Sequence, residues 1–241
     1  AFSAFYCFLI VRKIEIVHTD RDDFAKVPGL NRKLFGLGAP ILFQDVIISV
    51  GGLAVQFVIN GYGFLFVAGF TATNKLYGVL EMAAISYGYA VVSYVGQNLG
   101  AGKIERIRRG ILLATGYTCI WCTLNIVTAY TIGDWLVWLV TGSENPEVVY
   151  NATLYLKVDT LFYYVTAVIC IVRNAMQGLG ERIVPLISSS LEMIGKIVIA
   201  ATLVPMFGYP GVIAAEPIVW FIMIIPLLIK ILRMPVWKQK T

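Results

Sequence analysis

Six long apolar segments, separated by polar connectors, limit what this chain can fold into. A bilayer core about 30 Å thick requires about 20 apolar residues in a helix that rises about 1.5 Å per residue. The composition agrees, because 59% of the residues are hydrophobic and 14% are charged, against about 45–50% and about 25% in soluble domains. We therefore expect an all-α integral membrane fold with six transmembrane helices, at residues 34–60, 64–98, 107–133, 146–180, 183–206 and 211–232.

The two ends of the chain fall outside these six segments. The first residues are apolar but too few to span a bilayer. No basic flank precedes them and no small-residue cleavage site follows, which argues against a signal peptide. We interpret 1–11 as the end of a truncated transmembrane helix, 12–33 as a cytoplasmic connector, 34–233 as the six-helix lobe and 234–241 as a cytoplasmic tail.

The basic residues outside the spans all fall on alternate connectors. The connectors between them carry no Lys or Arg, and 134–147 carries only acids. Because connectors rich in Lys and Arg stay in the cytoplasm, both ends of the bundle are expected on that side of the cell membrane. The same placement accounts for the net charge of +5 without a nucleic-acid partner. The residues counted as cytoplasmic are Arg12, Lys13, Arg21, Lys26, Arg32, Lys33, Lys103, Arg106, Arg108, Arg109, Arg173, Arg182, Lys230, Arg233, Lys238 and Lys240.

Charged residues inside the spans are the main functional signal. A charge at the bilayer centre costs at least about 2.5–3.5 kcal/mol on insertion scales, so it has to be paired, hydrated, protonated or neutralised by a bound cation. Acids outnumber lysines here, and such a surplus is typical of a transporter that couples to a cation or a proton. The alternative is that each acid reaches a helix end or bonds a neighbour. The acids are Asp45, Glu81, Asp159, Glu192 and Glu216, and the lysines are Lys75, Lys157 and Lys196.

Two of these acids have different local settings. Asp45, beside Gln44, has no cation at i±3 or i±4 in its own helix, so we expect it to handle an ion or a substrate. Glu192 and Lys196 are four residues apart, a spacing that brings two side chains together on one helix face. We therefore expect these two to neutralise each other in a mainly structural pair.

Lys75 has no acid on its own helix face. It lies six residues before Glu81, so the two side chains point in different directions. We expect Lys75 to neutralise an acid on another helix, either Asp45 or Asp159. The alternative is that its long side chain extends toward the membrane surface.

Several motifs suggest catalysis or metal binding but lack the spacing or the partner residues that these functions require. GQNLGAGK lacks the spacing of a phosphate-binding loop, and Cys119 and Cys122 have no second pair of metal ligands. His18 lies in a polar connector and is expected to be solvated. Since no grouping of Ser, His, Asp or Cys indicates nucleophilic catalysis, we expect neither an enzyme nor a metal site.

The chain resembles the multidrug and toxic compound extrusion (MATE) family in four stretches. GAPILFQDVI followed by VINGYG resembles the seventh helix of that family, and VAGFTATNKLYGVLEMAAISYGYAVVSYVGQNLGAGK resembles the eighth helix and its following loop. VRNAMQGLGERIVPLISSSLEMIGK resembles the tenth and eleventh helices, and VPMFGYPGVIAAEPIVW the link into the twelfth. The resemblance implies one half, the C-terminal lobe, of a twelve-helix transporter with two six-helix lobes.

The resemblance also implies a function. Family members export organic, often cationic, compounds in exchange for Na⁺ or H⁺, and they need no cofactor apart from the transported ion. The implied partners are a small organic substrate, the lipid bilayer and the N-terminal six-helix lobe. Two alternatives remain open: a related exporter of a lipid-linked saccharide, and a non-transporting fragment or partner-binding membrane protein.

The resemblance assigns roles to some residues and leaves others to physical argument. One branch of the family carries coupling carboxylates in its seventh and tenth helices, where Asp45 and Asp159 lie, and the family usually has Arg at the position of Lys75. Aromatic rings could stack on a cationic substrate, or simply pack between helices; the candidates are Tyr77, Phe162 and Tyr163. We expect a rigid cytoplasmic corner or gate to be formed by Gly96, Gln97, Asn98, Gly100, Arg173, Gln177 and Gly178, with Gln97 and Asn98 satisfying freed carbonyls.

Overall fold

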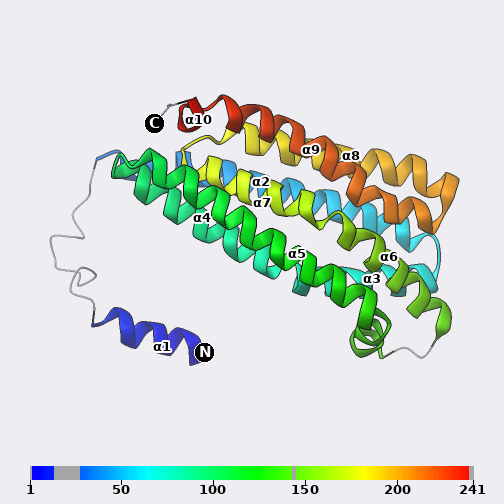
Figure 1. The fold of residues 1–241 in the computed structure, drawn as a ribbon. Helices are drawn as coiled ribbons and strands as arrows, with labels where there is room; N and C mark the ends of the chain where they lie inside the picture. Colours follow the sequence, from blue (N-terminus) through cyan, green and yellow to red (C-terminus); the bar gives the residue numbers. More distant parts are fainter. Residues whose placement is uncertain (1, 14–27, 143–144, 239–241) are drawn as a thin grey trace. The chain divides into compact units, whose positions relative to one another are not determined.

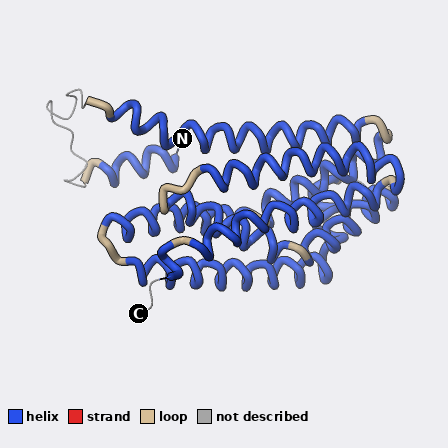
Figure 2. The backbone as a smooth tube through the Cα atoms, turned by 90° about the horizontal axis from the view of Figure 1, so that it is seen from above, coloured by secondary structure: helices blue, strands red, loops and turns tan. Residues whose placement is uncertain are grey.

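The computed structural model describes residues 2–13, 28–142 and 145–238. These residues form two compact units, which divide between Gly38 and Ala39. Every regular element among them is a helix (Figure 2). Some residues named above lie outside the described part of the chain: His18, Arg21, Lys26 and Lys240.

The first unit consists of a short helix and the beginning of a long one. The short helix, α1, covers Phe2–Val11, and the side chains of residues 4–11 are exposed. The long helix, α2, covers Leu30–Asn60 and continues into the second unit. The second unit adds α3 (Phe64–Leu80), α4 (Met82–Gly100), α5 (Ile104–Thr141), α6 (Pro146–Leu161), α7 (Tyr163–Gly178), α8 (Ile183–Phe207), α9 (Tyr209–Arg233) and α10 (Pro235–Lys238).

The helices reproduce the predicted spans. Among the described residues, α2, α5, α8 and α9 are each long and apolar enough to cross a membrane, and α3+α4 and α6+α7 qualify as bent pairs. This makes up to six spans, as expected. One boundary was wrong: α5 does not end at 133 but continues through a local kink at Ile132 to Thr141. Most of the expected outer connector 134–147 is therefore helical.

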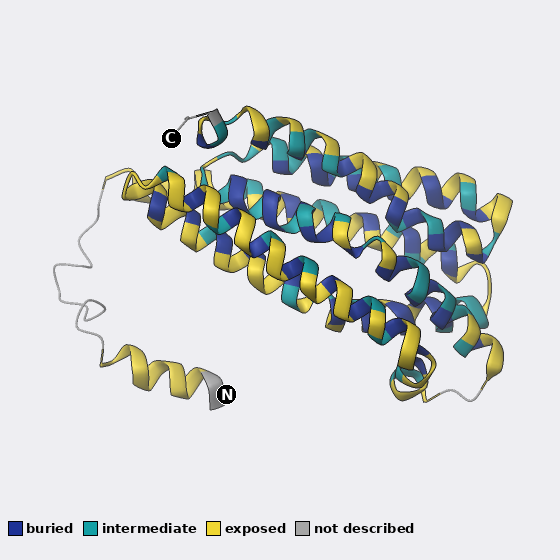
Figure 3. Ribbon diagram, viewed as in Figure 1, coloured by how far each residue is buried: buried dark blue, intermediate teal, exposed yellow. Residues whose placement is uncertain are grey.

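The helices of the second unit pack through one face and leave the other apolar and exposed. α8 lies along α9, α4 along α7, and α6 between α5 and α3 (Figure 1). Buried residues follow the contact faces, while exposed residues follow the outer faces (Figure 3). Large side chains such as Phe57, Leu113 and Ile120 are exposed. Apolar surface on this scale is not stable in water, whereas lipid covers it.

Two glycines let α4 and α7 approach closely. A Cβ on Gly178 would lie 2.8 Å from the carbonyl oxygen of Val92, and one on Gly88 would lie 2.6 Å from the amide nitrogen of Asn174. Small residues at membrane-helix contacts permit this kind of backbone approach. Gly178, predicted as part of a gate, is thus a helix-packing position. Gly96 lies on the same contact, 3.9 Å from the Gly178 carbonyl oxygen when a Cβ is built on it.

Neither helix break coincides with a proline, and both are contacted by α5. α3 and α4 meet at 42° and α6 and α7 at 55°. The Leu80 carbonyl at the first break accepts hydrogen bonds from Trp121 Nε1 at 2.7 Å and from Asn125 Nδ2 at 3.0 Å. At the second break, the Cys122 thiol donates to the Tyr163 carbonyl at 3.4 Å. Side chains from one stretch of α5 therefore donate to a backbone carbonyl at each of the two breaks.

Candidate functional site

A cavity of about 360 Å³ lies between α2, α3, α4, α7, α8 and α9. Most of the predicted ion and substrate residues converge on its wall, although the predicted residues there come from four separate stretches of sequence. Trp220 and Asn174 also line it and were not predicted, because nothing in their local sequence distinguishes them from packing residues. The predicted residues that line the cavity are Gln44, Asp45, Tyr77, Glu81, Arg173, Gln177, Glu192 and Lys196.

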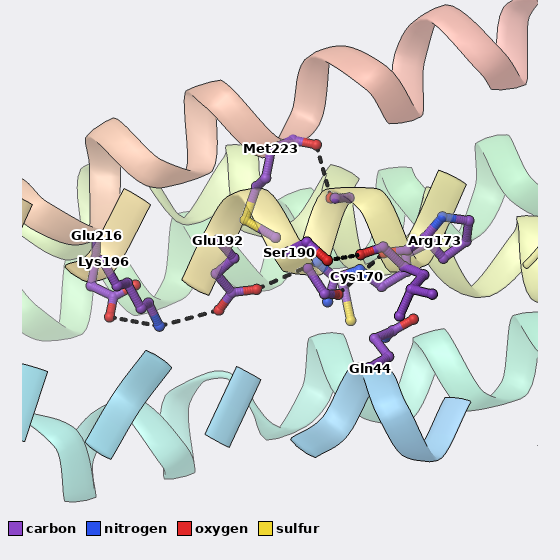
Figure 4. A network of polar contacts seen from close by, with 12 residues as sticks. Gln44, Cys170, Arg173, Ser190, Glu192, Lys196, Glu216 and Met223 are labelled. Carbon is purple, nitrogen blue, oxygen red and sulfur yellow. Dashed lines mark hydrogen bonds and ion pairs between the residues drawn. The ribbon is translucent and has the colours of Figure 1, made fainter. Parts of the chain in front are cut away.

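A chain of four charged side chains connects α7, α8 and α9, and three of the four, Arg173, Glu192 and Lys196, line this cavity (Figure 4). Lys196 Nζ lies 3.1 Å from Glu192 Oε1 and 3.0 Å from Glu216 Oε1, and Arg173 Nη2 lies 3.5 Å from Glu192 Oε2. The four side chains are between 9% and 20% exposed. The predicted Glu192–Lys196 pair is confirmed. It belongs to a larger network, because α7 and α9 each add one more charge.

Arg173 does not lie where the sequence placed it. It was counted with the cytoplasmic connector charges and assigned to a corner, but its side chain is only 12% exposed and lies against Glu192 on α8. Within the described part of the chain, its Nε and Nη2 atoms have no hydrogen-bond partner. One turn later, Gln177 Nε2 donates to Gln44 Oε1 at 3.2 Å, so these two residues join α7 to α2. The sequence could not show this, because Arg173 sits only one turn from the end of its helix.

Asp159 is the most deeply buried of the five acids, at 2% exposed. No ion pair of the described residues includes it, and its Oδ1 atom has no hydrogen-bond partner among them. It faces a small space that it shares with Glu216 and with polar groups of α3 and α6. The other residues around this space are Thr73, Asn74, Tyr77 and Tyr155.

Asp45 and Glu81 line the large cavity, and the ion pairs of the described residues include neither of them. Asp45 is exposed on α2, and Glu81 is half-buried at the break between α3 and α4. The expectation for Lys75 was wrong. Lys75 is exposed, and none of the ion pairs of the described residues joins it to Asp45 or Asp159.

The aromatic candidates divide between the cavity and the packing behind it. Tyr77 lines the cavity, stacks on Trp220 at 6.3 Å between ring centroids and meets Tyr163 edge-on at 5.6 Å. Tyr163 is buried behind these two rings. Phe162 packs on Phe221 instead and is not among the residues that line the cavity.

The predicted corner residues lie at helix ends that close with backbone hydrogen bonds. α4 ends at Gly100, and α4 and α7 are each followed by a left-handed glycine, Gly102 at φ 69° and Gly180 at φ 82°. The amides of these glycines donate back to the last turn at 3.0 Å, and the amides of the residues after them at 2.9 Å, in the Schellman pattern. The expectation that side chains satisfy these carbonyls was wrong: Gln97 is exposed, and the Asn98 amide donates within its own helix.

The described residues offer binding chemistry more than reaction chemistry. No three His, Cys, Asp or Glu side chains among them gather closely enough to hold a metal ion. The cavity is lined by two acids without ion pairs, Asp45 and Glu81, and by two aromatic rings, Tyr77 and Trp220. This combination can bind a charged aromatic compound by electrostatics and stacking.

Comparison with known proteins agrees with this picture. Residues 40–202 match the MatE family model. The chain is 31% identical over 147 residues to the probable multidrug resistance protein YpnP of Bacillus subtilis, covering 61% of this chain and 33% of that protein. It is 20% identical over 211 residues to the multidrug export protein MepA of Staphylococcus saprophyticus, covering 88% of this chain and 46% of that protein.

Solved structures share the fold. The crystal structure of a MATE protein in complex with MaL6 matches with a TM-score of 0.83 at 18% sequence identity, over 97% of this chain and 53% of that one. The chain thus spans between a third and about half of the length of these relatives. Because the family match covers most of the sequence, the chain belongs to the MATE family, whose members are membrane transporters and not enzymes.

Proposed function

We propose that this chain forms the C-terminal lobe of an exporter that expels organic cations in exchange for Na⁺ or H⁺. The lobe sits in the cell membrane with both of its ends in the cytoplasm, and an N-terminal six-helix lobe completes it. The chain covers 33% of YpnP and 46% of MepA, which supports the interpretation that it is one part of a longer transporter. We refer below to this chain joined to its other lobe as the complete transporter.

The observation that carries the proposal is the buried Asp159 carboxyl without an ion pair. A buried ionised carboxylate is unstable unless a cation or several hydrogen bonds compensate it. Glu216 borders the same space, so a bound cation or proton there would relieve two carboxylates at once. Thr73 and Asn74 add oxygen atoms of the kind that hard cations prefer. Loading and unloading this position would bias the lobe between two arrangements.

The large cavity supports the organic substrate. Its volume of about 360 Å³ lies in the range of about 300–1,000 Å³ typical of sites for drug-sized molecules. Asp45 and Glu81 supply negative charge without ion pairs. Tyr77 and Trp220 supply rings on which a cation can stack, at about 0.5–2 kcal/mol per contact.

The membrane potential and ion gradient would drive export. One elementary charge moving through the full potential releases about 2.3 kcal/mol per 100 mV, so one or two ions suffice for modest uphill transport. The competing reading, an exporter of a lipid-linked saccharide, calls for a positively charged cavity. The lining here contains three acids against two basic residues, which favours organic cations.

The experiment compares Asp159→Asn with Asp134→Asn in the complete transporter. Asp134 is an exposed acid on α5 and serves as the matched control. Ethidium efflux is followed in cells without exporters of their own, with a Na⁺ gradient and a pH gradient imposed separately. Asp159→Asn should abolish gradient-driven efflux while membrane insertion persists, and Asp134→Asn should leave efflux unchanged. Normal efflux in an inserted Asp159→Asn protein would refute the role of this carboxyl.

A further inference from the structure

The beginning of α5 carries a concentration of exposed positive charge. Its basic residues lie within 103–109 and are all exposed: Lys103, Arg106, Arg108 and Arg109. The acid in this first turn is Glu105, whose Oε1 atom lies 2.6 Å from Arg109 Nη2. None of the ion pairs of the described residues includes the other three bases. Most of the positive charge at this helix end is therefore not neutralised by the described residues.

This charge lies at the end of the helix where it is least favourable. The free N–H groups give the N-terminus of a helix a partial positive charge, so it attracts anions and repels cations. Lys103, the N-cap residue of α5, has no acceptor atom in its side chain that could satisfy those N–H groups. An anion beside this turn would interact favourably with the basic side chains and with the helix end.

The face of α5 that carries Arg106 and Arg109 continues as an apolar surface. Residues four or seven apart on a helix lie on the same face. Leu113, Ile120 and Val127 follow Arg106 at steps of seven residues and are 60%, 61% and 54% exposed. Leu113 also lies four residues after Arg109. Since α5 is long and apolar enough to span a membrane, lipid acyl chains cover this surface, and the two arginines lie where lipid headgroups begin.

The C-terminal helix holds this basic turn in place. α10 packs on α5 (Figure 1), and the buried Val236 forms one apolar cluster with Ile107 and Ile111. The Arg108 guanidinium lies over the Trp237 ring, with its Cζ atom 5.6 Å from the ring centroid. A guanidinium that stacks on a ring keeps its in-plane N–H donors for other acceptors. The turn is therefore positioned before any ligand binds.

We propose that the beginning of α5 binds the headgroup of an anionic phospholipid, with Arg106 on the phosphate and the acyl chains along Leu113 and Ile120. Basic side chains next to a bilayer attract anionic lipids, and a guanidinium binds a phosphate through two parallel hydrogen bonds. A zwitterionic lipid brings a positive charge of its own, which the basic turn repels. A free phosphate ion would gain nothing from the apolar surface. This inference goes beyond the proposed export and does not depend on it.

The rival account is that these bases act only during membrane insertion, where they keep the connector in the cytoplasm, and are afterwards solvated. The two accounts differ in whether the folded protein prefers one lipid headgroup. Dioleoyl-phosphatidylglycerol and dioleoyl-phosphatidylcholine test this, because they share their acyl chains and only the first has a net negative charge. Glycerophosphoglycerol, the headgroup of the first lipid without acyl chains, separates a lipid from a soluble anion.

The complete transporter is stripped of lipid in detergent and titrated with each lipid, and bound lipid is counted by native mass spectrometry. The wild type should prefer phosphatidylglycerol by about tenfold or more, since one basic residue at an anionic surface contributes about fivefold in affinity. Arg106→Gln should weaken its binding by about this fivefold factor. Arg233→Gln removes a lone exposed charge at the end of α9 and should leave the affinity nearly unchanged.

The variant Glu105→Gln gives the sharper test, because it should strengthen the binding of phosphatidylglycerol. It releases Arg109 from its ion pair and removes a negative charge beside the site. Misfolding cannot produce such a gain in affinity. Phosphatidylcholine, which carries no net charge, should bind this variant and the wild type equally.

Several results would overturn the proposal in favour of the rival account: equal affinity of the wild type for both lipids, equal losses in Arg106→Gln and Arg233→Gln, or no gain in Glu105→Gln. If glycerophosphoglycerol displaces the lipid at the concentration at which the lipid itself binds, the site takes a soluble anion and the lipid assignment is refuted. No transport is measured, so failure here leaves the proposed function intact, and a lack of ethidium efflux would leave this inference intact.

Discussion

Replacing Lys196 by methionine should destabilise this lobe more than any single change at its surface. The ammonium lies 3.1 Å from Glu192 and 3.0 Å from Glu216. Without it, Glu192 keeps only the contact with Arg173 at 3.5 Å, and Glu216 keeps no ion pair among the described residues. Removing one partner of a buried ion pair costs about 3–5 kcal/mol, because the other charge stays buried. Methionine has a similar length, so packing changes little.

The loss of stability should depend on how deeply an ion pair is buried and not on its N–O distance. The Lys230–Glu181 pair provides the control. Lys230 Nζ lies 2.7 Å from Glu181 Oε2, closer than either contact of Lys196, but Lys230 is 41% exposed. Exposed pairs contribute about 0.2–1 kcal/mol. At about 2–4 °C per kcal/mol for a chain of this size, Lys196→Met should lower the Tm by roughly 6–20 °C and Lys230→Met by less than about 4 °C.

The assay is thermal unfolding of the complete transporter in detergent, scored by the monodisperse fraction that survives heating. The double variant Lys196→Met/Glu216→Gln removes the stranded charge together with its partner. It should therefore recover most of the lost Tm, because a neutral amide needs no counter-charge. Two results would refute the reasoning: equal losses for Lys196→Met and Lys230→Met, or a double variant that is less stable than Lys196→Met.

Three further predictions follow from contacts elsewhere in the lobe. Trp121→Phe and Asn125→Leu should each lower the free energy of unfolding by about 1 kcal/mol, because each leaves the Leu80 carbonyl at the α3–α4 break one donor. The double variant leaves it none and should lose more than the sum of the two. Thermal unfolding of all three variants measures the losses. Gly178→Val should lower the Tm, because its side chain would meet the α4 backbone, at about 1–3 kcal/mol for overpacking. The hydrogen bond from Lys230 lowers the pKa of Glu181 in the folded protein. The Glu181–Lys230 coupling energy, measured by a double-mutant cycle, should therefore be complete above about pH 5, since an unfolded glutamate titrates near 4.3. It should vanish as the pH falls through the lower pKa of the folded state.

Properties that depend on one stretch of chain could be predicted from the sequence. Span length and apolar content are local, so the helices that can cross a membrane fall where the sequence placed them. The Glu192–Lys196 pair was predictable for the same reason, since a spacing of four residues on one helix brings the side chains together without any neighbour. The family resemblance rests on contiguous motifs and is confirmed by the match over residues 40–202.

Properties that depend on how helices face one another could not be predicted. Arg173 reaches Glu192, and Glu216 reaches Lys196, only because α7, α8 and α9 pack with a particular rotation and register. No periodicity within one helix encodes those angles. The same holds for Lys75, which is exposed and forms no ion pair with either expected partner.

The membrane class, the spans, the family and the in-helix ion pair were therefore determined by the sequence alone, because each follows from residues close together in the chain. Only the tertiary structure decided which acids keep an ion pair and which do not, and where the donors of Arg173 point. It also showed that α5 side chains donate to a backbone carbonyl at each of the two helix breaks. The physical reason is that the free energy of a buried charge depends on every helix around it, and that surrounding forms only when the helices pack.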